Sequence, residues 1–245
     1  DAKKIYAQAK PFPHIYFDDF FENSVVERVL QEFPGEYEID WIKYYDGHQK
    51  KLANEKEQNM GFFSRYLLYS LNSALFLKFL EKLTGIPNLI SDPSFRGGGL
   101  HNIYRGGRLG IHADFNKHER YGLDRRLNLL LYLNKDWREE YGGHIELWDS
   151  GMKQCVRSYL PKFNRVVIFT TNDTSYHGHP EPLRCPENMS RKSMALYYYT
   201  NGCLEEKVGN HHSTIFKLRT KEKVESKLTL KTKKLLRKSL KFFRK

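Results

Sequence analysis

Two stretches in the first hundred residues carry apolar residues at helical spacing. The first helix begins at Asn23 or Ser24, either of which can cap it, and Pro34-Gly35 ends it. The second helix is predicted over residues 64–83, and its apolar face consists of leucines that recur every three or four positions: Leu67, Leu68, Leu71, Leu75, Leu80 and Leu83.

From Leu100 onward the period changes to that of β-strands. Short runs rich in β-branched and aromatic residues alternate with turn residues such as Gly106-Gly107 and Gly142-Gly143. The predicted strands cover 100–105, 109–115, 126–133, 144–149, 153–160, 165–170, 174–180 and 193–200. Short strands at this spacing predict a barrel or a two-sheet jelly roll, so the expected fold class is mainly β with flanking helices. Residues 10–21 add a leading strand, and the polar stretch 50–58 is expected to form an exposed loop.

The chain shows no internal repeat and no flexible linker, which favours one domain with a tail. We expect the domain to span 1–215, with helical support in 1–99 and a jelly-roll core in 100–205. The tail is expected to span 216–245. No apolar run approaches the roughly 18 residues that a membrane-spanning helix needs.

The stretch I-H-A-D-F places two polar side chains of special chemistry inside a predicted strand. His112 and Asp114 are two residues apart, so in a strand both project from the same face. An imidazole and a carboxylate that point into one space supply two members of a 2-His-1-carboxylate triad, which holds non-haem Fe(II). Alone, this pair is a weak signal, and polar residues at a barrel rim would look the same.

A third ligand can come from the sequence S-Y-H-G-H-P, which offers His177 and His179. We favour His177, because it follows the apolar strand 165–170 and its turn. His179 lies on the same strand face and is the alternative ligand, or else a hydrogen-bond partner of another ligand.

A basic residue suited to a carboxylate follows fourteen positions after His177. Arg191 opens the strand S-M-A-L-Y-Y-Y-T, and its planar fork can make two parallel hydrogen bonds to a carboxylate. Ser193 points the same way and can add a hydroxyl. This arrangement is typical of a site for a dicarboxylic cosubstrate that chelates the metal at its other end.

Several short motifs, taken together, resemble one family. These motifs are Y-R-G-G-R-L-G-I-H-A-D (104–114), R-R-L-N-L-L-L-Y-L-N-K-D-W (125–137), G-G-H-I-E-L-W (142–148), P-K-F-N-R-V-V-I-F (161–169), H-G-H-P and R-K-S. Their order and spacing resemble the Fe(II)- and 2-oxoglutarate-dependent oxygenases, in particular the prolyl 4-hydroxylase branch. The resemblance covers about residues 100–200. The chain departs from the family in a longer segment between His177 and Arg191.

The resemblance implies a double-stranded β-helix that binds Fe(II) through His112, Asp114 and His177. It implies 2-oxoglutarate as cosubstrate, bound by Arg191, and O2 as oxidant, with ascorbate as an optional reductant. Two tyrosines, Tyr104 and Tyr132, match residues that contact the cosubstrate. The implied reaction releases succinate and CO2 and hydroxylates an unactivated C–H bond of a prolyl residue, an amino acid or another small metabolite.

Other interpretations stay open at this point. For Tyr104 and Tyr132 the alternative is ordinary strand aromatics, and Asn128 and Ile145 are compatible with either pocket or core. The same scaffold also supports desaturation, epimerisation and halogenation, although halogenation requires the position that Asp114 fills. A non-catalytic jelly-roll module, targeted to membrane or nucleic acid by its tail, is the alternative from another class. Five further histidines are expected to be structural or exposed: His101, His118, His144, His211 and His212.

Almost all of the net charge of +12 is carried by the tail. Residues 216–245 carry 13 basic and 2 acidic side chains, whereas the remaining 215 residues carry 28 and 27. On a helical wheel, Leu228, Leu235, Leu236, Leu240, Phe242 and Phe243 fall within an arc of roughly 160°, apart from the basic residues, and only Leu230 lies outside this arc. This pattern predicts a basic amphipathic helix over 226–245 that contacts an anionic membrane or packs on the domain. Nucleic-acid binding is disfavoured, because phosphate contact does not require a continuous apolar face.

Three widely spaced cysteines match no zinc or disulfide pattern, which favours a reducing, cytoplasmic location. The basic tail adds the expectation of peripheral membrane contact. The substrate is not encoded in a motif. We expect the loops that select it to lie in 36–62, 116–124 and 180–190.

Overall fold

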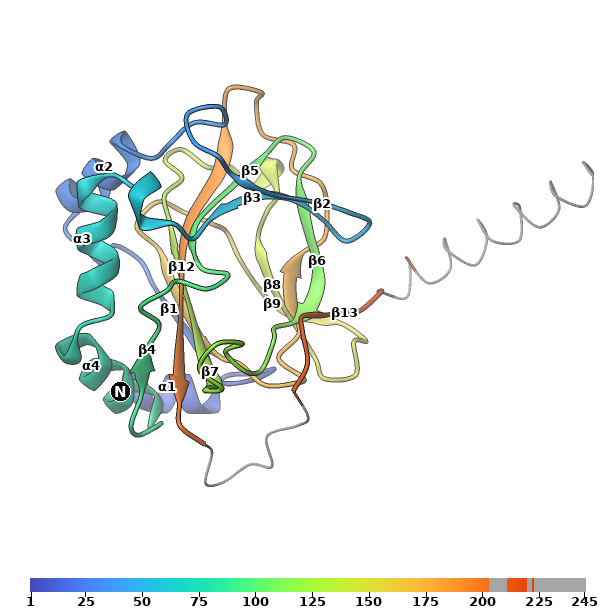
Figure 1. The fold of residues 1–245 in the computed structure, drawn as a ribbon. Coiled ribbons are helices and arrows are strands. Elements are labelled where there is room, and N and C mark those ends of the chain that lie inside the picture. The colour runs from blue at the N-terminus through green and yellow to red at the C-terminus, as the bar shows by residue number, and fades with distance from the viewer. Residues whose placement is uncertain (203–210, 220–221, 223–245) are drawn as a thin grey trace, which may run out of the picture.

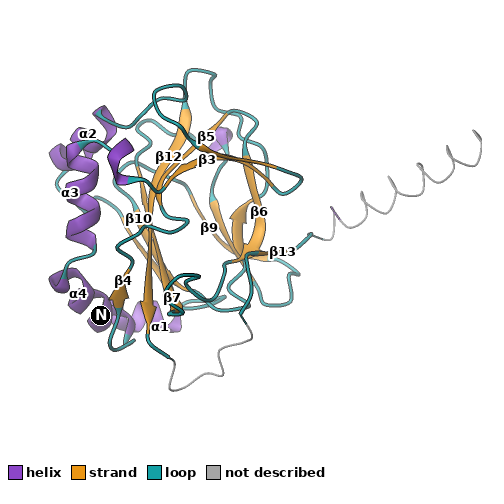
Figure 2. Cartoon of the chain, viewed as in Figure 1, coloured by secondary structure: helices purple, strands orange, loops and turns teal. Residues whose placement is uncertain are grey.

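The computed structural model describes residues 1–202, 211–219 and 222. Within this part of the chain, a 13-stranded antiparallel sheet curls on itself, and helices pack on one side of it (Figures 1 and 2). The strand order along the main path is β1 (His14–Phe17), β10 (Val166–Thr170), β7 (Asp124–Tyr132), β12 (Ser190–Thr200), β5 (Gly99–Tyr104), β3 (Gln49–Asn54), β6 (Arg108–Ala113), β11 (His177–His179), β8 (Ile145–Trp148) and β9 (Cys155–Tyr159). Three short strands pair beside this path: β2 (Ile42–Tyr45), β4 (Ile90–Ser91) and β13 (Ile215–Phe216).

All eight strands expected after residue 100 are present, with shifted ends. The expected loop over 50–58 is wrong for its first half, because Gln49–Asn54 forms β3 between β5 and β6. Its polar residues misled the prediction because Lys51 faces an internal cavity, and a cavity-facing position has the same polarity as an exposed one. The segment 1–99 therefore adds strands as well as helices to the sheet.

The helices are α1 (Ala2–Gln8), α2 (Asn23–Gln31), α3 (Phe62–Leu71) and α4 (Ala74–Thr84), with 3-10 turns at Glu57–Asn59 and Glu139–Tyr141. The helix predicted over 64–83 is thus two helices. Ser73 separates them, since its hydroxyl accepts a hydrogen bond from the Phe76 backbone N–H and caps α4. The break changes the helical phase, which leaves Leu75 81% exposed although Leu71 and Leu80 are buried.

Strand β7 shows how the sheet separates two cores. Leu127, Leu129 and Leu131 face the helices and join the larger core, whereas Leu130 and Tyr132 face the interior of the curled sheet. Both faces of this strand are buried. Because side chains alternate, each residue packs either against the helices or inside the curled sheet. The same alternation determines which side chains can reach a site inside the curl.

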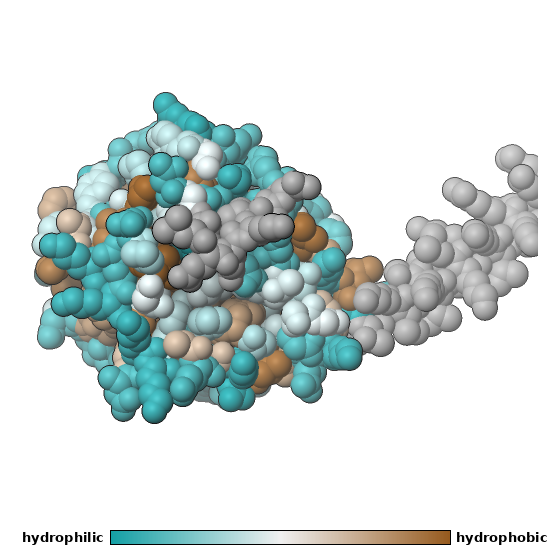
Figure 3. Space-filling model, turned by 90° about the horizontal axis from the view of Figure 1, so that it is seen from below, coloured by the Kyte–Doolittle hydropathy of each residue, from teal (hydrophilic) through white to brown (hydrophobic). Residues whose placement is uncertain are grey.

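None of the helices among the described residues is long and apolar enough to cross a membrane. Figure 3 shows a mostly hydrophilic face on which hydrophobic residues form small separate groups. The predicted basic helix over 226–245 lies outside the described residues. The chain pairs with the domain as far as β13, in which Phe216 stacks on His48. The boundary at 215 stays a prediction.

Candidate metal centre and cosubstrate pocket

The pairing of β6 with β11 brings three metal-type ligands together. His177 lies opposite His112 in the antiparallel register, and their ring centroids are 4.4 Å apart. Asp114 follows the end of β6, with its carboxylate oxygens 3.5 Å from Nε2 of each histidine. One donor atom of each residue lies within 4.8 Å of the other two. Such a cluster of two imidazoles and one carboxylate is a facial ligand set for a divalent metal.

Hydrogen bonds to the backbone orient both imidazoles toward this centre. Nδ1 of His112 lies 2.8 Å from the Gly110 carbonyl, and Nδ1 of His177 lies 2.9 Å from the Ser175 carbonyl. A ring that donates from Nδ1 keeps the lone pair of Nε2 for a metal. Burial lowers the pKa of His177 to about 4, so this ring is neutral at physiological pH. The three residues therefore fit a bound Fe(II) ion.

The carboxylate of Asp114 is held by two neighbours from β7. Oδ2 accepts hydrogen bonds from Nη2 of Arg125 at 2.8 Å and from the Asn128 amide at 3.3 Å. Burial alone would raise the pKa of Asp114, but Arg125 and the two histidines outweigh it and hold the pKa well below its usual range. The guanidinium of Arg125 in turn stacks over the rings of Tyr197 and Phe115, at 3.4 and 4.5 Å from their centroids. Asp114 is thus an ionised and oriented ligand.

His179 lies in the same strand but outside the cluster. A register irregularity separates it from His177, and it pairs with Leu109. It is buried and lines the cavity, and neither ring nitrogen has a hydrogen-bond partner within the described part of the chain. The geometry groups His177, rather than His179, with the other two ligands.

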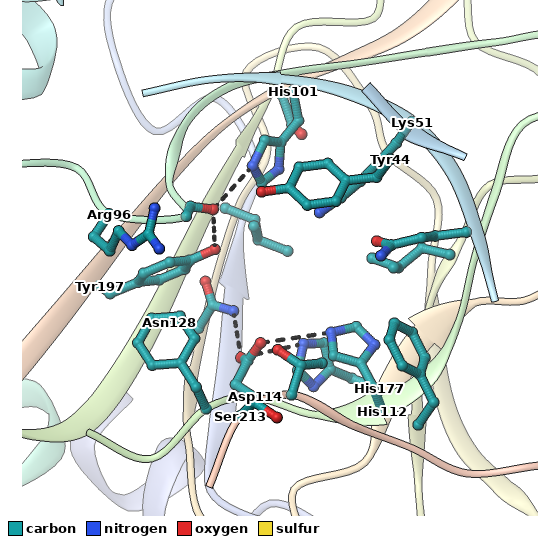
Figure 4. Close-up of a pocket in the computed structure, with 18 of the residues that line it drawn as sticks. Tyr44, Lys51, Arg96, His101, His112, Asp114, Asn128, His177, Tyr197 and Ser213 are labelled. Carbon is teal, nitrogen blue, oxygen red and sulfur yellow. Dashed lines mark hydrogen bonds and ion pairs between the residues drawn. The ribbon is translucent and has the colours of Figure 1, made fainter. Parts of the chain in front are cut away.

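A cavity of about 380 Å³ opens beside the three ligands (Figure 4). Such a volume is at the lower end of the roughly 300–1,000 Å³ typical of small-molecule pockets. Arg191 and Ser193 both line it, as does His101 from β5. The guanidinium of Arg191 is buried, and its Nε donates to the Gly143 carbonyl at 2.7 Å, while Nη2 donates to the Tyr132 hydroxyl at 3.2 Å. These two contacts fix the fork of Arg191 at the cavity wall.

Gly143 has a structural role in this support. Its φ of +74° favours glycine, and an added Cβ would lie 2.6 Å from Leu183 and 3.0 Å from Arg191. The sequence suggests only a turn at Gly142-Gly143, but the absence of a side chain at Gly143 also leaves room for Arg191.

The two predicted tyrosines have different positions. Tyr132 is fully buried, and its hydroxyl and ring both contact the guanidinium of Arg191. Tyr132 therefore holds the arginine side chain in position. Tyr104 lies on the other face of β5, where it packs against the larger core and accepts a hydrogen bond from Asn102 at 3.2 Å. Tyr104 does not line the cavity, so the structure gives no support to its contact with a cosubstrate.

Several lining residues were missed by sequence reasoning. His101, His211 and His212, expected to be structural or exposed, line the cavity. Asn128 and Ile145, for which the sequence left pocket and core positions open, line it too. Of the three segments expected to select the substrate, 116–124 contributes Lys117 and Glu119, and 36–62 contributes Tyr44, Gln49 and Lys51. Segment 180–190, expected to help select the substrate, contributes none of the lining residues, and residues 211–214 and Phe216 lie there instead. For His101 a signal was available in the alternation over 99–104, which places His101 and Ile103 on the face opposite to Tyr104.

Fold and site together define a jelly-roll protein with a 2-His-1-carboxylate centre. Residues 98–199 match the family model described as the 2OG-Fe(II) oxygenase superfamily. The prolyl 3-hydroxylase OGFOD1 of Mus musculus is 34% identical over 79 residues, which cover 31% of this chain and 14% of that protein. The chain thus spans a small part of the length of this curated relative.

Two solved structures share the fold. A prolyl 4-hydroxylase of Pseudomonas putida superposes with a TM-score of 0.57 at 13% identity, covering 82% of this chain and all of the other. A prolyl hydroxylase of Trichoplax adhaerens, solved with a peptide fragment of the hypoxia-inducible factor oxygen degradation domain, gives 0.57 at 17% identity, covering 81% and 88%. The predicted double-stranded β-helix and the predicted likeness to prolyl 4-hydroxylases are confirmed.

Proposed function

We propose that the protein is an Fe(II)- and 2-oxoglutarate-dependent dioxygenase that hydroxylates an unactivated C–H bond. One observation carries the proposal: the cluster of His112, Asp114 and His177 shares a single cavity with the buried guanidinium of Arg191. A metal-chelating acid whose second carboxylate reaches an arginine would bridge these two features.

Each residue has a role in this proposal. His112, Asp114 and His177 hold the metal, which when bound couples O2 and the decarboxylation of 2-oxoglutarate to the oxidation of a C–H bond. Arg191 binds the distal carboxylate of 2-oxoglutarate, and Ser193 adds a hydroxyl. Tyr132 and Gly143 keep the guanidinium in place. Arg191 is buried, and shielding from water strengthens such charge-assisted contacts.

The substrate proposal starts from the relatives. Their names include a prolyl 3-hydroxylase and a prolyl 4-hydroxylase, so a prolyl residue or free proline comes first. A free amino acid, a sugar or a lipid-linked metabolite follows. The test is succinate release with Fe(II), 2-oxoglutarate and ascorbate, with mass spectrometry for one added oxygen atom across amino acids, peptides and glycans. A protein that binds neither metal nor 2-oxoglutarate, and releases no succinate, would contradict the proposal and favour a non-catalytic binding module.

For the basic segment 226–245 we propose peripheral contact with an anionic membrane on the cytoplasmic side. The proposal rests on the separation of apolar and basic residues in the sequence, and each basic residue near such a surface adds about 1 kcal/mol. The test is co-sedimentation with anionic and neutral vesicles, comparing the full chain with a chain that ends at Phe216. If the full chain stays in the supernatant with anionic vesicles at low salt, the membrane proposal is wrong.

A further inference from the structure

The charged side chains around the cavity are not all paired. Arg96 pairs with Glu55 and Glu119 at 3.2 and 3.1 Å, and Lys117 pairs with Asp124 at 3.1 Å. The carboxylate of Asp114 pairs with Arg125. Two lining cations, Arg191 and Lys51, have no carboxylate partner among the described residues.

Lys51 belongs to β3 and lines the cavity on the side opposite the predicted metal ligands. It pairs in register with Tyr44 of β2, and its Nζ lies 5.1 Å from the centroid of that ring. Figure 4 shows Lys51 and Tyr44 on one side of the open space and the three predicted metal ligands on the other. Alternation along β3 turns the neighbouring Lys50 to the opposite face, where it is exposed.

Two histidines that line the same cavity as Lys51 add hydrogen-bonding capacity to it. His179 is 3% exposed, and both of its ring nitrogens lack a partner within the described chain. His101 is 9% exposed and uses Nε2 for the Gly97 carbonyl at 3.2 Å. A buried imidazole with no partner is unfavourable, and a ligand that accepts its N–H would remove this cost.

The cosubstrate of the proposed function does not require Lys51. One carboxylate of 2-oxoglutarate goes to the metal and the other to Arg191, so both of its negative charges are compensated. A second uncompensated cation in the same cavity is unfavourable until an anion enters. The remaining anion must then come from the molecule that is oxidised.

We propose that Lys51, together with His179 and His101, binds a carboxylate or phosphate group of the substrate. This inference rests on the proposed function and narrows it: the substrate is a small acid, and a neutral residue inside a polypeptide is disfavoured. Tyr44 lines the same cavity, with its ring beneath the Nζ of Lys51. When its anionic group is bound at Lys51, the substrate lies across the cavity from the predicted metal ligands.

The test measures anion binding without turnover. The full chain is loaded with Zn(II), which is not redox active, and saturated with 2-oxoglutarate; acetate and inorganic phosphate are then titrated at millimolar concentration by calorimetry. Lys51→Gln removes the charge, Lys51→Arg keeps it, and Lys50→Gln is the matched control on the exposed face. We expect Lys51→Gln to weaken anion binding by about tenfold or more, while Lys51→Arg and Lys50→Gln bind within a few-fold of the unchanged protein.

Matched substrates then distinguish the source of the anion. L-proline is compared with L-prolinamide, glucuronate with glucose, and glucose 1-phosphate with glucose, by calorimetry and by succinate release with Fe(II). A preference for the acidic member of a pair that Lys51→Gln abolishes supports the inference.

Three results would overturn it. These are the absence of acetate and phosphate binding, anion binding that Lys51→Gln leaves unchanged, and a loss of 2-oxoglutarate affinity in Lys51→Gln as large as the loss of anion affinity. The proposed function fails differently, through the absence of Zn(II) or 2-oxoglutarate binding in the unchanged protein.

Discussion

Arg125 and Asp114 form a buried ion pair, in which Nη2 of the arginine lies 2.8 Å from Oδ2 of the aspartate. Their side chains are 1% and 10% exposed. Two aromatic rings enclose the guanidinium, so the aspartate is held by a residue that cannot easily move. We infer that Arg125 positions the carboxylate and compensates its charge before a metal binds.

Replacing Arg125 with Met should destabilise the metal-free protein by about 3–5 kcal/mol, because Asp114 is left buried without its counter-charge. Bound Zn(II) should recover part of this loss, since the metal compensates the same carboxylate. Urea unfolding with and without Zn(II) measures both values. Arg120→Met, at an exposed position, is the control and should have little effect. An equal loss in both conditions would mean that Arg125 supports the fold but not the ligand.

The choice of the third ligand can be decided by two alanine variants. His177→Ala should weaken metal binding by more than the roughly 10–100-fold that is typical of losing an outer hydrogen-bond partner of a ligand. His179→Ala should leave metal affinity nearly unchanged, because this ring lies outside the cluster. Co(II) absorption spectra report both the affinity and the ligand environment. The opposite ranking of the two variants would transfer the role to His179.

Asp114→Ala should abolish succinate production. Arg125 then lacks its partner, so circular dichroism must first show that this variant is folded. Asp40→Ala, at an exposed position, is the control. Full activity in Asp114→Ala would exclude the proposed centre.

Arg191→Ala should raise the concentration of 2-oxoglutarate needed for half-saturation at least tenfold. Losing one partner of a buried charge-assisted contact costs about 2–5 kcal/mol. Calorimetric titration of the Zn(II)-loaded protein with 2-oxoglutarate measures the change directly. Arg165→Ala is the matched control, because Arg165 pairs with Asp18 at 2.7 Å and does not line the cavity. An unchanged requirement in Arg191→Ala would place the anchor elsewhere.

Anion binding at Lys51 should weaken as the pH rises above about 8. Burial lowers the pKa of Lys51 to about 8; Asp114 opposes this shift, and Arg125 and Arg191 add to it. The free protein therefore carries the charge below this pH and loses it above, so anion affinity falls by up to about tenfold per pH unit. The ring of Tyr44 contacts Lys51, and the other titratable or charged groups that interact with it electrostatically are Asp46, His101, Asp114, Arg125, His179 and Arg191.

The same shift predicts an effect on stability with a definite sign. The folded protein binds fewer protons at Lys51 than the unfolded chain between about pH 8 and the ordinary lysine pKa of 10.5, so this residue's contribution to stability rises across that window. Below pH 8 its charge is unfavourable in the ligand-free protein, and Lys51→Gln should therefore be more stable than the unchanged protein at pH 7. Thermal unfolding at pH 7 and pH 10 provides the measurement. A destabilised Lys51→Gln at pH 7 would show that Lys51 has a structural partner.

The sequence by itself determined the features that depend on local spacing. His112 and Asp114 share a strand face because side chains alternate with a period of two, and the strands after residue 100 follow from the same alternation. The types of residue at 177 and 191 indicated an imidazole and a carboxylate-binding guanidinium. These inferences need no knowledge of which strands are neighbours.

The tertiary structure decided everything that depends on register between distant strands. It placed His177 opposite His112, turned Tyr104 away from the cavity and brought Lys51 of a supposed loop to the side of the cavity facing the ligands. Register is set by packing on both faces of the sheet, which involves residues far apart in the chain. A polar side chain that faces an internal cavity looks the same in the sequence as one that faces water, so Lys51 and Arg125 could be recognised only from the folded chain.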